Sequence, residues 1–239
     1  MGGLHHHNQI LSYLHRRFPD FIADRARQFS FVHGDIIGEA GQPIDQVFFP
    51  SSGMISIVVD LREGGRVEAA MVGPANAIGG SIVFGGRAHI NTSFAQLPGS
   101  GWSLPATDMI ELSNRDQAVR GVMFNNEQYL MAQAQQTAAC NARHVIPRRL
   151  ATWILRAIDA SETNELVLTQ EYLAQMLGVQ RASVSMFAGE LQDKGFIFYR
   201  RGRVRVLDRE GLAREACECH MTLRSQAARL SEADLHQTS

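Results

Sequence analysis

The chain has 239 residues, a formal net charge of −1 and 45% hydrophobic residues, a length that predicts two domains, each with its own apolar core. No run approaches the roughly 18–20 consecutive apolar residues of a membrane helix, and no basic N-terminal segment precedes an apolar stretch, so we expect a cytoplasmic protein with no membrane contact. Cys140, Cys217 and Cys219 are too few for the disulfide framework of a secreted domain, so reduced thiols are expected.

Residues 31–105 contain repeated short apolar runs rich in β-branched and aromatic residues. The clearest runs are residues 47–49, 54–59, 67–72 and 94–97. Glycines separate these runs at intervals of roughly 8–12 residues, the turn spacing typical of a β barrel or sandwich. We therefore predict an antiparallel β domain in the first half of the chain.

Residues 108–144 lack these glycine turns and are rich in Gln, Ala, Met, Glu and Arg, which predicts one long helix. Met123, Leu130 and Thr137 recur every seven residues, which favours a coiled-coil contact between two copies of the chain. The intervening positions are polar or small, so the sequence alone does not establish this contact. These positions are Asn126, Gln133 and Cys140. Pro147 predicts a break, so we expect a hinge near residues 141–147.

After the hinge, residues 148–160 predict an amphipathic helix that closes over the core of the C-terminal domain. Its apolar face holds Leu150, Trp153, Ile154 and Ile158. The last stretch, from about Thr222 onward, is polar and has no strong apolar stripe, so we expect it to fray or to be disordered.

The most specific signal lies in residues 168–207 and predicts a helix-turn-helix. Thr169 is suited to N-cap a helix, with Glu171 in its first turn, and Gly178 permits the left-handed backbone of a tight turn. A second helix is predicted from about residue 180 to 193, with Val184 and Leu191 facing inward. Residues 180, 181, 183 and 185 are then available on its outer face.

A hairpin with a cationic tip follows the two helices. Residues 196–199 and 204–207 are strand-like, and Arg200, Arg201, Gly202 and Arg203 join them. Residues 180–206 hold six cationic side chains and two carboxylates, a local net charge of +4 despite the neutral whole. Such a patch indicates a nucleic-acid partner. The alternative is a helix pair and hairpin whose basic surface is merely solvated.

At these residues the chain resembles the Crp/Fnr transcription regulators. The N-terminal half resembles the family's β-roll at Gly34, Gly41, residues 45–49, Gly53, Gly64 and residues 78–79, and the segments 136–144 and 217–219 resemble one subgroup. The resemblance implies an α+β fold with an antiparallel, cyclic-nucleotide-binding-like β-roll (a jelly roll), a long dimerisation helix and a C-terminal winged helix-turn-helix. We assign residues 1–107 to the β-roll, 108–145 to the dimerisation helix and hinge, 146–214 to the DNA-binding domain and 215–239 to a tail.

The resemblance implies a homodimer on a two-fold symmetric operator in double-stranded DNA, with RNA polymerase as a candidate further partner. Arg181 matches the arginine that reads a guanine, while Ala182 and Met186 stand where the family often has a glutamate and an arginine, so the operator should differ from the family consensus. The full set of expected DNA-binding residues is Thr169, Gln170, Gln180, Arg181, Ser183, Ser185, Arg200, Arg201 and Arg203.

The expected effector pocket departs from the cyclic-nucleotide binders of the family. Those proteins use a Gly-Glu pair for the ribose and an Arg-Ser/Thr pair for the phosphate, but here the pairs are Gly79-Gly80 and Asn91-Thr92. Burying a phosphate without a cation is costly, and Arg87 in the neighbouring loop is the one candidate substitute. We therefore expect neither cyclic AMP in its usual pose nor another cofactor, although a small-ligand sensor module remains an alternative.

A thiol- or metal-responsive regulator is a second alternative. Cys217, Cys219 and His220 form a Cys-x-Cys-His group that, with Cys140 and His144 if the fold brings them together, is a candidate metal site; packing of Cys140 in a helix interface is the simpler interpretation. No cysteine precedes Cys140, which excludes the N-terminal iron–sulfur cluster of the family's oxygen sensors. The sequence does not predict an enzyme, because His33, His89, His144 and Glu39 are scattered and no nucleophile elbow or phosphate loop is present.

Overall fold

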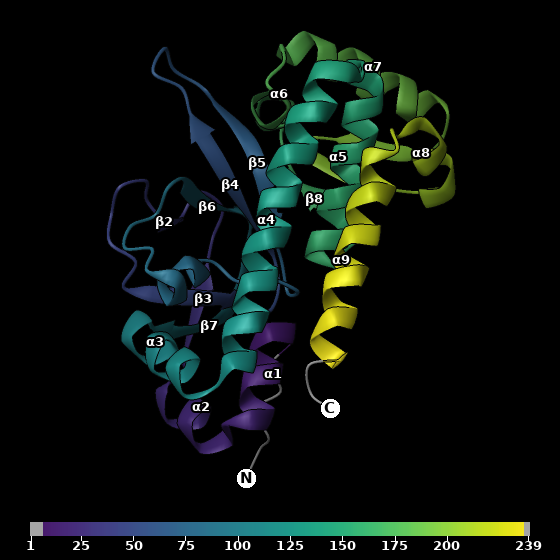
Figure 1. The fold of residues 1–239 in the computed structure, drawn as a ribbon. Helices are drawn as coiled ribbons and strands as arrows, with labels where there is room; N and C mark the ends of the chain where they lie inside the picture. Colours follow the sequence, from purple (N-terminus) through teal and green to yellow (C-terminus); the bar gives the residue numbers. More distant parts are fainter. Residues whose placement is uncertain (1–6, 237–239) are drawn as a thin grey trace.

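The computed structural model describes residues 7–236 (Figure 1). Its first half holds two antiparallel sheets, with strand orders β1-β7-β3 and β2-β6-β4-β5. The strands are β1 (Arg27–Phe31), β2 (Ile36–Gly38), β3 (Gln46–Pro50), β4 (Met54–Asp60), β5 (Arg66–Val72), β6 (Thr92–Leu97) and β7 (Gly99–Pro105). The predicted antiparallel β domain is confirmed, and the apolar runs at residues 47–49, 54–59, 67–72 and 94–97 lie in β3 to β6.

The hairpin of β4 and β5 illustrates why these residues form strands. Ile55 pairs with Val72 and Ile57 with Ala70 in an antiparallel register, and β-branched side chains fit such a pleated, half-buried surface. Gly64 and Gly65 have φ values of 91° and 87° in the connecting turn, a left-handed conformation that glycine adopts without steric cost. Aliphatic and aromatic side chains of both sheets, Phe49 and Phe94 among the largest, are fully buried.

Two short helices precede the first strand and were not predicted. They are α1 (Gln9–Arg17) and α2 (Pro19–Arg25). The Asn8 side chain caps α1 by accepting from the Leu11 amide, and its Nδ2 donates to the carbonyls of Pro50 and Asn76. Asn8 is fully buried, so a polar residue near the start of the chain ties α1 to the β domain with all its hydrogen bonds made.

The single helix predicted for residues 108–144 is two helices, α3 (Ala106–Arg115) and α4 (Gln117–Arg143). Asp116 separates them with an extended backbone, and its side chain caps α4 by accepting from the Ala118 amide. Arg17 forms an ion pair with the same carboxylate. An aspartate at a helix start favours such a cap over continuation of the preceding helix, which explains the break.

The long helix α4 is attached to its own β domain through two buried amides. Asn126 accepts from the Ala77 amide at 3.0 Å and donates to the Ala77 carbonyl at 3.1 Å, and Gln133 pairs with both backbone groups of Met71 in the same way. The stripe proposed as a dimer seam lies on this side too: Met123 is fully buried, and Thr137 donates to the Ala69 carbonyl. That seam is therefore wrong, because its side chains contact their own chain.

The C-terminal domain is built from α5 (Ile146–Ser161), β8 (Glu165–Val167), α6 (Gln170–Leu177), α7 (Arg181–Asp193), β9 (Ile197–Arg200), β10 (Arg203–Val206) and α8 (Arg209–Glu215). The amphipathic helix predicted for residues 148–160 corresponds to α5 and buries Leu150, Trp153, Ile154 and Ile158. Strand β8 was not predicted; it pairs with β10, so the wing is a three-stranded sheet in the order β8-β10-β9.

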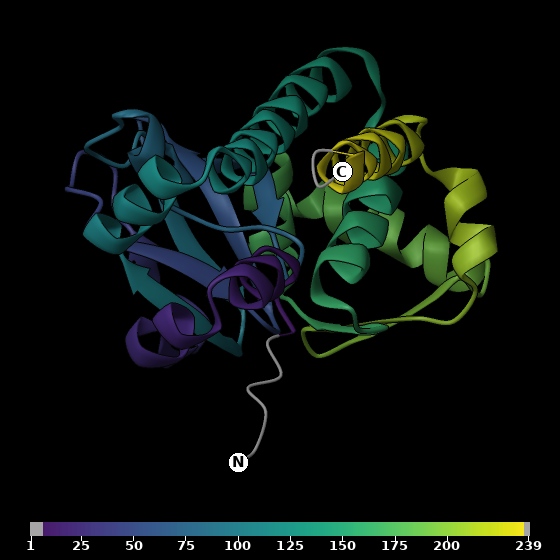
Figure 2. The same ribbon diagram turned by 60° about the horizontal axis from the view of Figure 1, so that its bottom comes forward.

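The predicted disorder after residue 222 is wrong, because α9 (Cys219–His236) runs beside α4. Figure 1 shows the two helices side by side, and Figure 2 shows α4 between the β domain and the C-terminal domain. Leu223 is buried, and Gln136 of α4 donates to Cys219 at the start of α9. Tertiary contacts thus compensate for the weak apolar stripe. Within residues 7–236, no helix is long and apolar enough to cross a membrane.

The two domains also contact each other directly. The Trp153 indole of α5 donates to Glu68 of β5 at 2.9 Å, and Ser56 donates to the same carboxylate at 2.6 Å. Burial raises the pKa of Glu68 to about 7, although Arg156 and these two donors act in the opposite direction. Gly73, at the end of β5, lies against the Ala160 carbonyl with no space for a Cβ. The C-terminal domain is therefore packed closely on the β domain.

Candidate functional site

The predicted helix-turn-helix is formed by α6 and α7. Thr169 caps α6 as expected, its hydroxyl accepting from the Tyr172 amide at 3.2 Å. Gly178 ends the helix with φ 62° and ψ 42°, the left-handed conformation predicted for the turn. Val184, Ala188 and Leu191 bury the inner face of α7. Local sequence signals therefore determine the angle at which α7 leaves α6.

The outer face of α7 is open to solvent. Gln180 is its N-cap residue and is exposed, as are Arg181 and Ser185, while Ser183 is half-buried. Met186 lies beside them with 55% of its surface exposed. The free backbone N–H groups of a helix N-terminus carry partial positive charge. This end of α7 therefore presents an arginine, hydroxyl groups and a positive dipole together.

The wing beside α7 is a tight cationic hairpin. Arg200 pairs with Arg203 across the turn, in which Arg201 has φ 48° and Gly202 has φ 74°. Two successive positive φ values match the hairpin turn whose twist fits the flanking strands. Arg200, Arg201 and Arg203 are all exposed. Arg203 forms an ion pair with Glu165 of β8 at 2.9 Å, a partner that the sequence analysis missed because β8 was not predicted.

At the expected effector pocket, side chains of α4 lie against Gly80. Gly79 and Gly80 begin a short 3-10 helix (Gly80–Phe84), and a Cβ at Gly80 would meet Met123 Cε and lie 2.7 Å from Glu127 Oε1 of α4. Burial raises the pKa of Glu127. The position at which nucleotide binders carry their ribose-binding glutamate is therefore filled by α4.

The remaining pocket residues follow this short helix along the chain. Arg87 is an exposed loop residue whose carbonyl accepts from the Ile44 amide, Asn91 is half-buried, and Thr92 is buried at the start of β6. Sequence reasoning missed that Met123 and Glu127 cover Gly80. It placed Met123 in a dimer seam, and no sequence signal pointed to Glu127.

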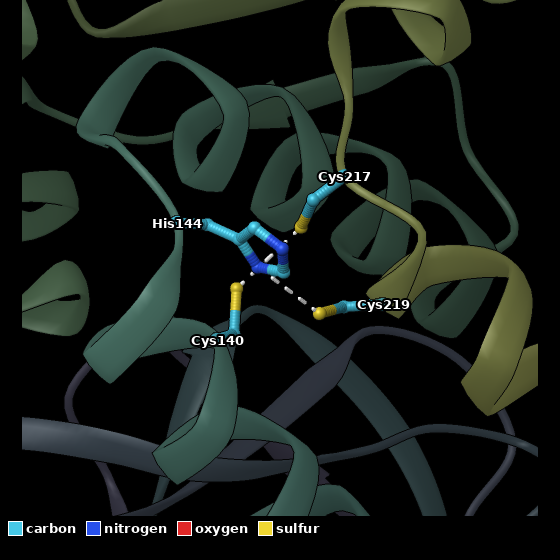
Figure 3. A group of neighbouring side chains, drawn as sticks. All are labelled: Cys140, His144, Cys217 and Cys219. Carbon is cyan, nitrogen blue, oxygen red and sulfur yellow. Dashed lines mark hydrogen bonds between the residues drawn. The ribbon is translucent and has the colours of Figure 1, made fainter.

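Four of the five candidate metal ligands come together. The ligand atoms of Cys140, His144, Cys217 and Cys219 all lie within 4.8 Å of one another, and Figure 3 shows the His144 ring and the three sulfur atoms facing one another. The fifth candidate, His220, is directed elsewhere and contacts Asp159 through Nε2 at 2.8 Å. Hydrogen bonds from Cys140 and Thr152 lower the pKa of the Cys217 thiol to about 5, while its neighbour Cys140 has a raised pKa.

Comparison with known proteins identifies two domains. The family model described as a Crp-like helix-turn-helix domain matches residues 148–215, and the cyclic nucleotide-binding domain matches residues 28–116. A search of curated protein sequences finds no match.

Solved structures of regulators share the fold over about four fifths of this chain. FixK2 from Bradyrhizobium japonicum superposes with a TM-score of 0.69 at 18% identity, covering 80% of this chain and 98% of FixK2. TTHA1359 from Thermus thermophilus, a CRP/FNR family transcriptional regulator, gives 0.62 at 25% identity, covering 80% and 98%. The c-di-GMP responsive regulator CLP from Xanthomonas campestris gives 0.64 at 12% identity, covering 79% and 97%. With both domains matched in the family's order on the family's fold, the chain belongs to the Crp/Fnr family of transcription regulators.

Proposed function

We propose that the protein binds DNA sequence-specifically as a homodimer on a two-fold symmetric operator. The observation that carries this proposal is the exposed N-terminal end of α7, with Arg181 and Ser185, beside the exposed arginines of the wing. An α-helix of this kind fits the major groove of B-DNA, in which the base edges can be distinguished.

Base reading is assigned to α7. Arg181 can make a bidentate contact with a guanine, a contact that contributes roughly 1–3 kcal/mol of discrimination. Ala182 next to it is exposed and apolar, so it has no acceptor for a cytosine amino group. Met186, also exposed, offers an apolar surface that suits a thymine methyl group better than a guanine. The operator is therefore expected to depart from the consensus of family members with charged residues at these two positions.

Phosphate contacts are assigned to the residues around α7. Thr169 and Gln170 lie at the N-terminus of α6, where backbone N–H groups favour an anion. Gln180 and Ser183 lie near the N-terminus of α7. The wing adds charge through Arg200, Arg201 and Arg203. Such contacts position the protein on the duplex without reading its sequence.

A second copy of the chain is expected on the outer face of α4. Phe124 and Met131 are 49% and 56% exposed there, seven residues apart on the side opposite the buried amides. Ala138, seven residues further on, is also exposed. A heptad spacing of apolar or small residues suits a coiled-coil seam between two parallel helices. This seam replaces the one inferred from sequence, and it would hold the two α7 helices about one DNA turn, near 34 Å, apart.

The effector pocket is proposed to take no cyclic nucleotide. With Gly80 covered by Met123 and Glu127, and with Asn91 at the position that the resemblance gives to the phosphate-binding arginine, the pocket lacks the charged pair that binds the ribose and the phosphate. We infer that the protein binds its operator without a nucleotide.

Selection of genomic DNA fragments by the purified full-length protein tests the function. The proposal predicts enrichment of one inverted-repeat motif, bound at least about a thousandfold more tightly than unrelated DNA. Sedimentation should show a dimer, which Met131→Glu should convert to monomer, whereas Met221→Glu at an exposed position on α9 should leave it intact. No enriched motif, or a monomer that binds the motif fully, would refute the proposal.

A further inference from the structure

The candidate site formed by Cys140, His144, Cys217 and Cys219, here named the thiol–imidazole cluster, is not used by the DNA-binding function. Cys140 and His144 lie one turn apart at the end of α4, Cys217 lies in the loop between α8 and α9, and Cys219 is the first residue of α9. The two halves are 77 residues apart in sequence at the Cys140–Cys217 pair. All three thiols are buried, and the His144 side chain is 17% exposed.

Two pairs of donor atoms have the spacing of ligands around one tetrahedral ion, and all four donor atoms lie within 4.8 Å of one another. The Sγ atoms of Cys140 and Cys217 are 3.5 Å apart, as are Cys219 Sγ and His144 Nδ1. A tetrahedral zinc ion, with bonds of about 2.3 Å to sulfur and about 2.0 Å to nitrogen, holds such atoms roughly 3.5–3.8 Å apart. An iron–sulfur cluster joins its cysteines through several metal and sulfide atoms and needs them further apart. The cluster therefore has space for a single ion.

Three of the four ligands also have an outer partner that orients them. His144 directs Nδ1 at the sulfur atoms while its Nε2 lies 3.2 Å from the Glu218 carboxylate, the arrangement that fixes the tautomer of a metal-binding histidine. Gln136 Nε2 donates to Cys219 Sγ at 3.0 Å. Thr152 accepts from the Cys217 amide, so its hydroxyl proton is directed at Cys217 Sγ, 3.0 Å away. A chance group of thiols would not need these partners.

The charge around the cluster suits the complex as well. Three thiolates, a neutral imidazole and a divalent ion leave one negative charge in a buried place, which needs a nearby cation. The Arg149 guanidinium of α5 interacts electrostatically with Cys140 and Cys217. Its buried Nε has no hydrogen-bond partner among the residues that the structure describes. Arg149 is thus placed to balance the charge of the filled site.

We propose that Cys140, His144, Cys217 and Cys219 bind one zinc ion as a structural site. Four protein ligands complete a tetrahedron and leave no open position for substrate, which distinguishes structural from catalytic zinc. The set of three sulfur atoms and one nitrogen selects zinc over magnesium, calcium or manganese, which prefer oxygen. Ligand atoms this close need only small side-chain shifts to meet an ion.

The ion would cross-link chain segments at the junction between the two domains. It would join the end of α4 to the start of α9, immediately beside α5, where the DNA-binding domain begins. Resting on the proposed function, this placement implies that zinc fixes the orientation of α7 relative to the dimer helix. Loss of the ion should loosen that orientation and weaken operator binding without removing any DNA contact.

Metal analysis of the full-length protein tests the site directly. His5, His6 and His7 should first be changed to Ala, and nickel columns avoided, because an N-terminal histidine run binds metal by itself. We expect one zinc ion per chain. Cobalt(II) added to the metal-free protein should give the sulfur-to-cobalt charge-transfer bands and the visible bands of a tetrahedral thiolate site, a readout independent of DNA.

Variants separate the cluster from its surroundings. Cys219→Ser and His144→Gln should reduce zinc to background, Glu218→Ala should weaken zinc binding about 10–100-fold, and His220→Gln, at the buried histidine outside the cluster, should retain one zinc ion. Cys219→His keeps a zinc-binding side chain and should retain the ion. This result would show that Cys219→Ser loses zinc because a ligand is missing and not because the protein misfolds.

Three results would overturn the proposal. These are a protein without stoichiometric zinc, cobalt spectra without charge-transfer bands, and a Cys140–Cys217 disulfide found by mass spectrometry in freshly purified protein. Operator affinity is measured separately. Zinc binding without any operator binding would count against the proposed function alone. An operator affinity that zinc removal leaves unchanged would refute the inference that zinc fixes the orientation of α7.

Discussion

The two regions in which family resemblance predicts a ligand differ in what their side chains contact. On the outer face of α7 and on the wing, Arg181, Ser185 and Arg201 are exposed. At the effector pocket, the position next to Gly80 is covered by Met123 and Glu127 from α4. The comparison teaches that side chains of α4 cover the position where the charged residue is missing, whereas the proposed DNA-reading surface keeps its polar side chains in solvent.

The largest expected effect concerns Glu68, which joins the two domains that carry these regions. Its pKa is raised by burial from 4.5 to about 7. Between these values the folded protein keeps a proton that the unfolded chain has lost, so the free energy of unfolding should fall as the pH rises from 4.5 to 7 and change no further above 7. The total loss corresponds to about 3 kcal/mol.

Glu68→Gln should remove this dependence and make the protein more stable than the parent at pH 8, because the glutamine accepts from Trp153 without titrating. Denaturant unfolding at pH values from 5 to 8 measures the free energy of unfolding of both proteins. Glu165→Gln, at an exposed carboxylate, is the control. A parent protein whose stability rises over this range would contradict the burial of an uncompensated carboxyl group.

Arg181→Ala tests the reading surface. It should lower discrimination against operators with a changed guanine by roughly 1–3 kcal/mol while leaving the dimer intact. Titrations of matched and mutated operators measure this, with Arg229→Ala, at an exposed arginine on α9, as the control. Discrimination that survives the change would remove Arg181 from base reading.

A pair of glycine substitutions compares packing in the two regions. A Cβ at Gly80 meets Met123 and Glu127, whereas a Cβ at Gly189 in α7 finds nothing within 4 Å. Gly80→Ala should therefore destabilise only slightly, by less than about 1 kcal/mol, because the flexible ends of Met123 and Glu127 can shift, and Gly189→Ala should stabilise by roughly 0.5–1 kcal/mol through helix propensity. The melting temperature should fall in Gly80→Ala and rise in Gly189→Ala. Changes in the same direction would show that side chains of α4 do not pack against Gly80.

The smallest effect should separate the wing arginines. Arg201→Gln should weaken binding to all sequences alike and lower the slope of log K against log salt by about 0.9 per lost phosphate contact. Arg203→Gln should change the slope less, since Arg203 is paired with Glu165. Salt titrations of both variants measure the slopes. Equal slopes would mean that the ion pair opens on DNA.

The features predicted from sequence are those that local chemistry determines. The cap at Thr169, the left-handed turn at Gly178 and the cationic hairpin each depend on residues close in sequence. The break at Asp116 was also a local signal, but the helical composition on both sides concealed it.

The features that were missed depend on contacts between distant residues. In the sequence, Asn126 and Gln133 are polar residues that interrupt a predicted coiled-coil contact. Only the fold shows that they bind the backbone groups of Ala77 and Met71. Helix α9 has a weak apolar stripe of its own and is held by α4. The thiol–imidazole cluster likewise joins two segments whose approach no spacing rule predicts.

Calorimetry with cyclic AMP and cyclic GMP, repeated as an operator titration with each nucleotide present, tests the central contrast most directly. We expect no heat of nucleotide binding at micromolar concentrations and one specific operator affinity that the nucleotides leave unchanged. Micromolar binding with an operator affinity raised tenfold, about 1.4 kcal/mol of coupling, would show that the pocket opens and that Arg87 or another cation serves it.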